Sequence, residues 1–177
     1  MAIRAIARLR AELFHVFQQI VGLLPDQGLT VRLRRAFYGC YLRKAGSFSS
    51  CSGLKIHGPE NVSIGDGVSM NTGVIIDAAD GGDIQIGNDV LIGPYCVIRA
   101  ADHIFSDTAV PIRQQGHAGG KIVIEDDCWL GSHVVVTRDV TIGKGSVIGA
   151  HSVVTHDIPP YSIAVGVPAK VQRNRRD

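Results

Sequence analysis

The sequence predicts an all-β fold, a parallel β-helix of six-residue repeats with an N-terminal helical segment and an excursion loop. Aliphatic side chains return every six positions between Lys121 and Asp157, a small residue follows the first five of them four positions later, and glycine directly follows several. Neither an α-helix nor a single regular strand has a period of six, whereas a coil of three short strands does. The pattern comprises the aliphatic residues Ile124, Leu130, Val136, Ile142, Ile148 and Val154, the small residues Cys128, Val134, Val140, Ser146 and Ser152, and Gly131, Gly143 and Gly149.

The composition agrees with such a coil, which is stabilised by stacking neighbouring turns rather than by a globular core. Aromatic residues make up 6% of the 177 residues, which suits a narrow interior, and 21 glycines supply the turns. The net charge of +2 is too small to indicate a nucleic-acid partner. The four cysteines show no Cys-x-x-Cys pairing, so we expect reduced interior residues in a cytoplasmic protein.

Residues 1–45 are expected to form two basic helices. Met1–Leu24 has apolar residues at helical spacing, with arginines at positions 4, 8 and 10 between them, which is unlike a signal peptide and too short in apolar length to span a membrane. Pro25–Gly28 breaks this helix, and Leu29–Ala45 is expected as the second one. The pair either caps the open end of the coil or attaches the protein to an anionic membrane at its inner face.

Residues 46–165 are expected to form the coil, and residues 166–177 a basic tail. Gly46–Gly58 is rich in Ser and Gly and is expected to be irregular, so that the six-residue rhythm begins near Ile64. Asp77–Asp83 contains two adjacent glycines and is expected to be a small insertion at a turn.

Residues 101–120 interrupt the rhythm, because the next aliphatic residue in phase after Ile98 is Ile124. The segment is too long for a turn and too polar for a coil, so it is expected to project as a loop. Long loops in compact domains tend to be functional. Its polar and turn-forming residues are Asp102, His103, Asp107, Pro111, Arg113, Gln114, Gln115 and His117.

Several short stretches resemble one known family. They are Asp102-His103 at the start of the loop, Asp127-Cys128-Trp129-Leu130-Gly131-Ser132 after it, Ile148-Gly149-Ala150, Val154-Thr155, and the closing Gly166-Val167-Pro168-Ala169-Lys170. Together with the hexads, these stretches are similar to the left-handed β-helix (hexapeptide-repeat) acyltransferases, and among them to the O-acetyltransferases that modify sugars and surface polysaccharides. The resemblance covers residues 64–173. It implies a left-handed coil, acetyl-CoA as the co-substrate and no metal.

The resemblance implies a role for each matching residue. His103 would be the general base that takes the proton of the acceptor, since histidine titrates near neutral pH. The backbone of Ser132 would stabilise the oxyanion of the tetrahedral intermediate. The remaining donor-binding positions would be Trp129, Gly131, Ser132, Ala150 and Thr155, with Lys170 and Arg173 at the phosphates. Ser132 and Ala150 are 18 residues apart, the length of one coil, and are therefore expected to form one strip.

The resemblance also bears on the acceptor, which would be a saccharide hydroxyl that attacks the thioester directly, without a covalent enzyme intermediate. The galactoside and maltose branch holds its sugar through Asn residues and paired acids, but Asn71 is out of step with them and only Asp77 resembles one of the acids. Asp77 is thus the candidate substrate-binding residue. The stretches His103-Ile104-Phe105 and 111–116 look like the branch that serves polysaccharide biosynthesis. An N-acetyltransferase acting on a nucleotide-sugar amine is the alternative.

A homotrimer is expected, because outward valines on a flat face tend to be buried by neighbouring copies. These valines are Val135, Val147 and Val153. In the family the active site lies between two subunits, so the resemblance implies that the loop reaches toward an adjacent chain.

Two other readings of the same coil stay open. One is a zinc protein like the γ-type carbonic anhydrases, in which His133, His151 and His156 would supply converging ligands. The other is a non-catalytic scaffold, which explains the coil but gives no purpose to Asp102-His103 or to Trp129.

Overall fold

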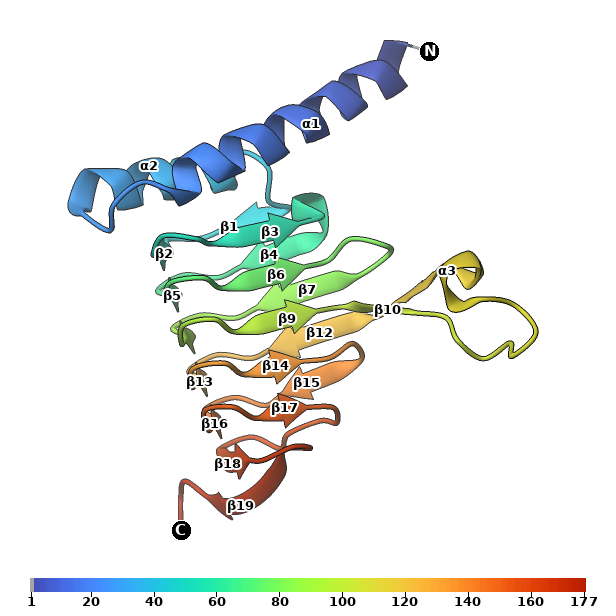
Figure 1. The fold of residues 1–177 in the computed structure, drawn as a ribbon. Coiled ribbons are helices and arrows are strands. Elements are labelled where there is room, and N and C mark those ends of the chain that lie inside the picture. Colours follow the sequence, from blue (N-terminus) through green and yellow to red (C-terminus); the bar gives the residue numbers. More distant parts are fainter. Residues whose placement is uncertain (1) are drawn as a thin grey trace.

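The computed structural model describes residues 2–177, with the side chains of Leu9 and of residue 11 onward. It confirms a parallel β-helix with an N-terminal helical segment and an excursion loop (Figure 1). Met1 lies outside the described residues, as do the side chains of the arginines at positions 4, 8 and 10. No helix in the described part of the chain is both long enough and apolar enough to cross a membrane.

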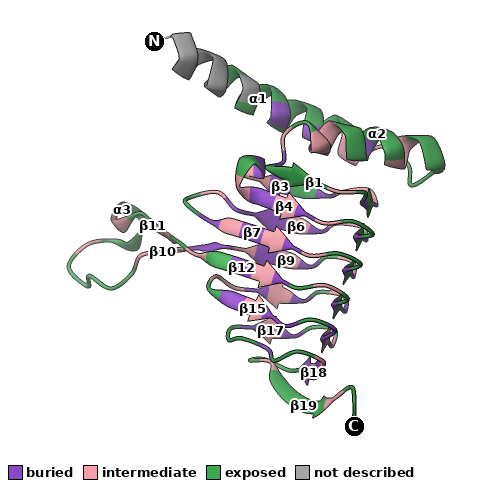
Figure 2. Ribbon diagram, turned by 180° about the vertical axis from the view of Figure 1, so that it is seen from behind, coloured by how far each residue is buried: buried purple, intermediate pink, exposed green. Residues whose placement is uncertain are grey.

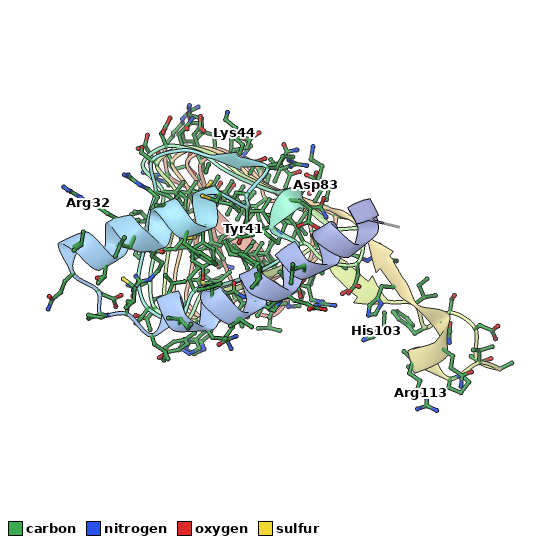
Figure 3. The ribbon with its side chains drawn as sticks, turned by 90° about the horizontal axis from the view of Figure 1, so that it is seen from above. Arg32, Tyr41, Lys44, Asp83, His103 and Arg113 are labelled. Atoms are coloured by element: carbon green, nitrogen blue, oxygen red, sulfur yellow. The ribbon has the colours of Figure 1, made fainter. Side chains whose placement is uncertain are left out.

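The two N-terminal helices lie across one end of the coil (Figure 3). Helix α1 spans Ala2–Gly22 and α2 spans Gly28–Gly39. They pack against each other through stacked rings of Phe14 and Phe37, whose centroids are 5.6 Å apart. Phe14 is 2% exposed, so the helices extend the apolar core beyond the first coil.

The second helix is shorter than expected, because it ends at Gly39 and not at Ala45. The residues that follow join the coil instead. The amide of Arg43 donates to the carbonyls of Pro59 and Val62. Strand β1 (Lys44–Ala45) pairs with strand β4 (Val62–Ile64).

The short strands stack into three faces, called A, B and C below. Face A holds β1, β4 (Val62–Ile64), β7 (Asp83–Ile86), β12 (Lys121–Ile124) and β15 (Val140–Ile142). Face B holds β2 (Ser49–Ser50), β5 (Ser69–Met70), β8 (Leu91–Ile92), β13 (Trp129–Leu130), β16 (Val147–Ile148), β18 (Ser162–Val165) and β19 (Lys170–Asn174). Face C holds β3 (Lys55–His57), β6 (Ile75–Asp77), β9 (Val97–Arg99), β14 (Val135–Val136) and β17 (Val153–Val154).

Each turn of the coil runs from face A to face B to face C. The segment between two faces is a corner, named by the faces that it joins, and the position of a functional residue is given below by its corner. Corner BC includes residues 93–96, 131–134 and 149–152, and corner CA includes residues 78–82, 100–120, 137–139 and 155–157. The aliphatic residues of the repeat form inward ladders along each face, such as Ile86, Ile124 and Ile142 on face A. The six-residue period therefore marks one inward aliphatic position that recurs in successive strands.

The coil begins earlier than the rhythm indicates, since residues 46–58 are its first turn and not an irregular segment. Strands β2 and β3 belong to this turn, and Phe48, Leu54 and Ile56 are buried. The pattern is hidden because Ser50 occupies the inward position on face B, where its side chain is 2% exposed. The short helix η1 (Pro59–Asn61) then adds residues before the next strand.

The predicted loop leaves the coil at corner CA, where residues 101–119 project as a hairpin (Figure 1). Its stem is β10 (Ala101–His103) paired antiparallel with β11 (His117–Gly119), and its tip carries the short helix α3 (Ile112–Gln115). At the far end of the coil the basic tail folds back, because β19 pairs antiparallel with β18.

Candidate active site

The excursion loop is anchored to the coil by backbone contact and by one ion pair. A methyl group on Gly119 would lie 2.2 Å from the carbonyl oxygen of Gly81, so only glycine permits this approach of the hairpin to the neighbouring turn. On the other strand of the stem, Asp102 accepts a hydrogen bond from Nε of Arg138 at 2.9 Å. The stem is thereby held against the turns on either side of it.

Two histidines face each other on this stem. His103 and His117 are paired residues of β10 and β11, and their ring centroids lie 4.2 Å apart with an interplanar angle of 37°. His103 is exposed, and Figure 3 shows it near the coil, with Arg113 farther out along the loop. The expected base is thus on an anchored hairpin with its ring open to solvent.

A network of charged side chains lies behind the histidine pair. Nε2 of His117 is 3.8 Å from a carboxylate oxygen of Asp80, and the same oxygen is 3.7 Å from the guanidinium of Arg99. Arg99 also pairs with Asp77 and donates through Nε to the carbonyl of Ala101 at 2.8 Å. The network connects the small insertion, face C and the loop. Sequence reasoning missed Asp80 and Arg99 and gave no role to His117.

Asp77, the expected sugar contact, is bound within the chain. One of its carboxylate oxygens pairs with Arg99, and the other accepts from the amide of Ala79 at 3.1 Å. The residue is 8% exposed. Its ion pair with Arg99 joins it to the charged network behind the histidines.

The expected strip at corner BC is present. The amide of His151 donates to the carbonyl of Ser132 at 2.9 Å, and a methyl group on Gly131 would lie 2.6 Å from the amide nitrogen of Ala150. Gly131 uses its own N–H on the carbonyl of Ile148. Within the part of the chain that the structure describes, the N–H of Ser132 has no acceptor, so it is a donor at this corner that a ligand could use.

The indole of Trp129 lies on the outer side of face B. Trp129 pairs with Val147, which pairs with Ile163, which pairs with Arg173. Leu130 is buried and Trp129 is 52% exposed, so this row points outward. Trp129 and Arg173 stand three strands apart in one row, about 14 Å at an inter-strand spacing of about 4.8 Å.

Of the remaining donor positions, Lys170 belongs to the same face and Thr155 does not. Lys170 pairs with Val165 at the start of β19 and is exposed. Thr155 follows β17 and therefore lies at corner CA, separated by a whole face from Ala150. Within one chain Thr155 and Ala150 therefore lie at different corners, because five residues carry the backbone from one corner to the next.

The histidines of the zinc alternative are arranged as a stack. His133 and His151 have nearly parallel rings, 4.8 Å apart at 11°, and Tyr95 continues the stack. His156 lies at the other corner, with Nδ1 2.9 Å from the hydroxyl of Thr155. Stacked rings direct their nitrogens sideways rather than toward a common point, and the described residues contain no group of three metal-ligating side chains.

A groove of about 630 Å³ on face A contains none of the expected site residues. Its charged lining includes Arg43, Lys144 and Asp126. The amide of Asn88 donates to Asp126 and holds the pKa of that carboxyl below its usual value. The sequence offered no signal for this groove, because its lining comes from five successive turns of the coil.

The expected catalytic and donor residues fall into two groups within one chain. His103 projects at corner CA, whereas Ser132 and Ala150 lie at corner BC and Trp129 lies on face B. A whole face separates the groups. One chain by itself therefore does not bring the base to the strip where the donor is expected.

Known proteins share both the repeat and the fold. Residues 121–156 match the family model of the bacterial transferase hexapeptide repeat. The chain is 40% identical over 121 residues to a galactoside O-acetyltransferase of Lactococcus lactis, an alignment that covers 68% of this chain and 56% of that protein. It is 48% identical over 94 residues to a probable acetyltransferase of Mycobacterium tuberculosis, covering 53% and 31%. The chain thus spans about half or less of the length of these curated relatives.

One solved structure matches nearly the whole chain. A hexapeptide-repeat acetyltransferase of Vibrio cholerae superposes with a TM-score of 0.79 at 32% identity, over 95% of this chain and 94% of that one. The same protein in complex with acetyl coenzyme A gives a TM-score of 0.77 at 34% identity, over 94% and 89%. The chain belongs to the hexapeptide-repeat transferase family. The left-handed β-helix is the fold of that family, so the handedness implied by the resemblance is confirmed.

Proposed function

We propose that the protein transfers an acetyl group from acetyl-CoA to a hydroxyl of a saccharide, in the biosynthesis of a surface polysaccharide. The observation that carries this proposal is His103, an exposed imidazole on a hairpin anchored at both strands. The similarity to a galactoside O-acetyltransferase and to an acetyltransferase solved with acetyl-CoA supports the same donor and acceptor class.

The reaction is a direct attack on the thioester. A ring nitrogen of His103 takes the proton of the acceptor hydroxyl. At the same time the oxygen of that hydroxyl forms a bond to the thioester carbonyl carbon. The N–H of Ser132 donates to the oxyanion of the tetrahedral intermediate. When the carbon–sulfur bond breaks, the thiolate of coenzyme A leaves and receives the proton held on the imidazole, so the reaction yields an acetyl ester and a free thiol.

The donor would lie along corner BC and the outer row of face B. Trp129 presents an exposed indole for the apolar part of the pantetheine arm, and Arg173 lies in the same row for a phosphate group. Lys170 adds a second cation on β19, the strand that also carries Arg173. Trp129→Ala should raise the KM for acetyl-CoA several-fold and change kcat less, whereas Trp129→Phe should keep most of the affinity. An unchanged KM in the alanine variant would place the donor elsewhere.

The complete site would form between two copies in a homotrimer, with His103 from one chain and Ser132 from the next. The separation of the two groups within one chain supports this arrangement. So does the outer row of face C, where Ile75, Val97 and Val135 are only partly exposed and apolar.

The base is tested by replacing it. His103→Ala should fold normally, since the ring is outside the stacked core, and should lower kcat by about 10²–10⁴-fold while acetyl-CoA still binds. Release of free thiol from acetyl-CoA with a panel of saccharide acceptors measures kcat, and amine-bearing nucleotide sugars belong in the same panel. A folded variant that kept more than about a tenth of wild-type kcat would remove His103 from the mechanism.

The two-chain site is tested by mixing two inactive variants. His103→Ala lacks the base, and Ala150→Trp would fill the donor strip beside Ser132. Co-expressed chains that assemble at random should recover about a quarter of wild-type activity, because that share of interfaces joins two intact halves. Each variant alone should stay inactive. No recovery in mixed trimers, verified by differential tags, would mean that both groups act within one chain.

A further inference from the structure

The outer side of helix α1 is apolar although it faces away from the coil. Phe14 and Gln18 are buried on the side that meets the coil, with 2% of each residue exposed. The opposite side carries a stripe at intervals of three and four residues, which is one face of a helix. It consists of Leu9 (56% exposed), Leu13 (43%), Val16 (59%) and Ile20 (55%), and it continues past the helix end with Leu23 (86%).

Helix α2 repeats this arrangement. Arg34 and Tyr38 point inward and are fully buried, whereas Leu29 and Leu33 are 71% and 50% exposed. Seen along the axis of the coil, both helices lie in front of it, and their outer sides are largely exposed (Figures 2 and 3). The exposed apolar side chains of both helices therefore lie on the outer side of the end of the coil. We call the exposed residues 9, 13, 16, 20, 23, 29 and 33 the cap surface.

The cap surface is rigidly attached to the coil, so it is a built feature and not a frayed end. The buried guanidinium of Arg34 donates to the carbonyls of Ser50 and Leu24 and pairs with Asp26 at 3.1 Å. The hydroxyl of Tyr38 donates to the carbonyl of Leu54 at 2.6 Å. These bonds fix both helices to the first turn, which keeps the apolar stripe turned outward.

Charge is concentrated in the same segment. The first 45 residues contain eight of the 18 basic residues and two of the 16 acidic ones, a net charge of +6, whereas the rest of the chain has a net charge of −4. Arg32 and Arg35 of α2 are exposed beside Leu33, and neither has an acidic partner among the described residues. The acid between the helices, Asp26, is already paired with Arg34.

We propose that the cap surface docks on an anionic lipid membrane, with the helices lying in the plane of the headgroups. Apolar side chains in the acyl boundary and arginines at anionic headgroups are the combination that holds such helices at a bilayer. A second copy of the cap is a poor occupant, because two N-terminal segments that each have a net charge of +6 would face each other. The coil would then stand upright on the membrane and carry the excursion loop beside it.

Vesicle flotation of the full-length protein tests the proposal. Vesicles of neutral phosphatidylcholine are compared with vesicles that also contain phosphatidylglycerol, each at low and at high salt. We expect binding to the anionic vesicles that weakens as salt rises. Equal binding to both vesicles, or binding to neither, would overturn the proposal.

Two pairs of substitutions separate the apolar and the charged contributions. Val16→Glu/Ile20→Glu should abolish binding, and Arg32→Glu/Arg35→Glu should weaken it by at least about tenfold. All four side chains are exposed, so the thermal unfolding of these variants should match the wild type. The matched control is Ile112→Glu/Arg113→Glu, which makes the same kinds of change on α3 and should bind like the wild type.

The same variants identify the competing occupant. If Val16→Glu/Ile20→Glu left vesicle binding intact but reduced the mass seen by light scattering, the cap surface would be an interface between copies and the proposal would be wrong. If all the variants bound vesicles as the wild type does, another part of the chain would be responsible, and the proposal would again fail.

Discussion

Gly119→Ala tests whether the backbone contact under the excursion loop holds His103 in its working position. The added methyl group would lie 2.2 Å from the carbonyl oxygen of Gly81, whereas an ordinary contact is 3.4 Å or longer. Both sides of this contact are backbone, so neither can rotate away, and the two segments must separate by about 1 Å. Gly119 pairs with Ala101 and His117 with His103 in one hairpin, so the displacement reaches the histidine pair directly.

The expected effect is large on catalysis and moderate on stability. A misplacement of about 1 Å at a catalytic group costs on the order of 100-fold in rate. Overpacking of this kind lowers the free energy of unfolding by about 1–3 kcal/mol. We therefore expect kcat to fall about 100-fold with an unchanged KM for acetyl-CoA, because the donor strip at Ser132 lies at another corner. Thiol release measures both constants, and urea unfolding measures the stability.

Gly28→Ala is the matched control, because a methyl group there would meet nothing within 4 Å. It should leave kcat and stability as in the wild type. If Gly119→Ala kept kcat within about threefold of wild type, the loop would not be positioned by its approach to Gly81, and the reasoning from this contact would be refuted.

Three further predictions concern single side chains. His117→Gln should lower kcat about tenfold without altering the donor KM, because it removes the ring that packs against His103, the proposed base; an unaltered kcat in a steady-state assay would contradict this. Arg34→Leu should lower the free energy of unfolding by about 3–5 kcal/mol, because it removes the ion pair of Asp26 and leaves several carbonyls unpaired. Arg35→Leu, at the exposed neighbouring position, should change the free energy of unfolding by less than about 0.5 kcal/mol. Urea denaturation distinguishes the two variants. Burial raises the pKa of the Cys96 and Cys128 thiols, so alkylation at pH 8 followed by mass spectrometry should label neither until the protein is denatured.

The coil was predictable because its signal is repeated and local. Each inward position recurs at a fixed spacing, so that Ile124, Ile142 and their counterparts predict their own burial without knowledge of the rest of the chain. The first turn of the coil was not predicted, because a single polar residue, Ser50, fills an inward position. The end of α2 was not predicted for a different reason. The backbone of Arg43 is hydrogen-bonded to residues 59 and 62, and this tertiary contact overrides local helix propensity.

The arrangement of the candidate site was predictable only where its residues lie in register. Ser132 and Ala150 differ by one coil length, and the structure places them side by side. No fixed spacing in the sequence predicts the charged network behind the histidines. Its residues Asp80, Arg99 and His117 come from an insertion, a strand end and a hairpin of unrelated lengths. The signal that could have found them is the glycine at 119, which permits the hairpin to approach the insertion.

The β-helix itself explains why the proposed chemistry would need more than one chain. Stacking brings residues together along the coil axis, at the same corner of successive turns, but it never brings two corners together, because the packed interior lies between them. An exposed base at corner CA and an open N–H at corner BC can meet only when the corner of one copy lies against the corner of another. A loop that projects beyond its own coil is the element suited to bridge that distance, which is why we place the catalytic base on the excursion and the donor on the regular repeat.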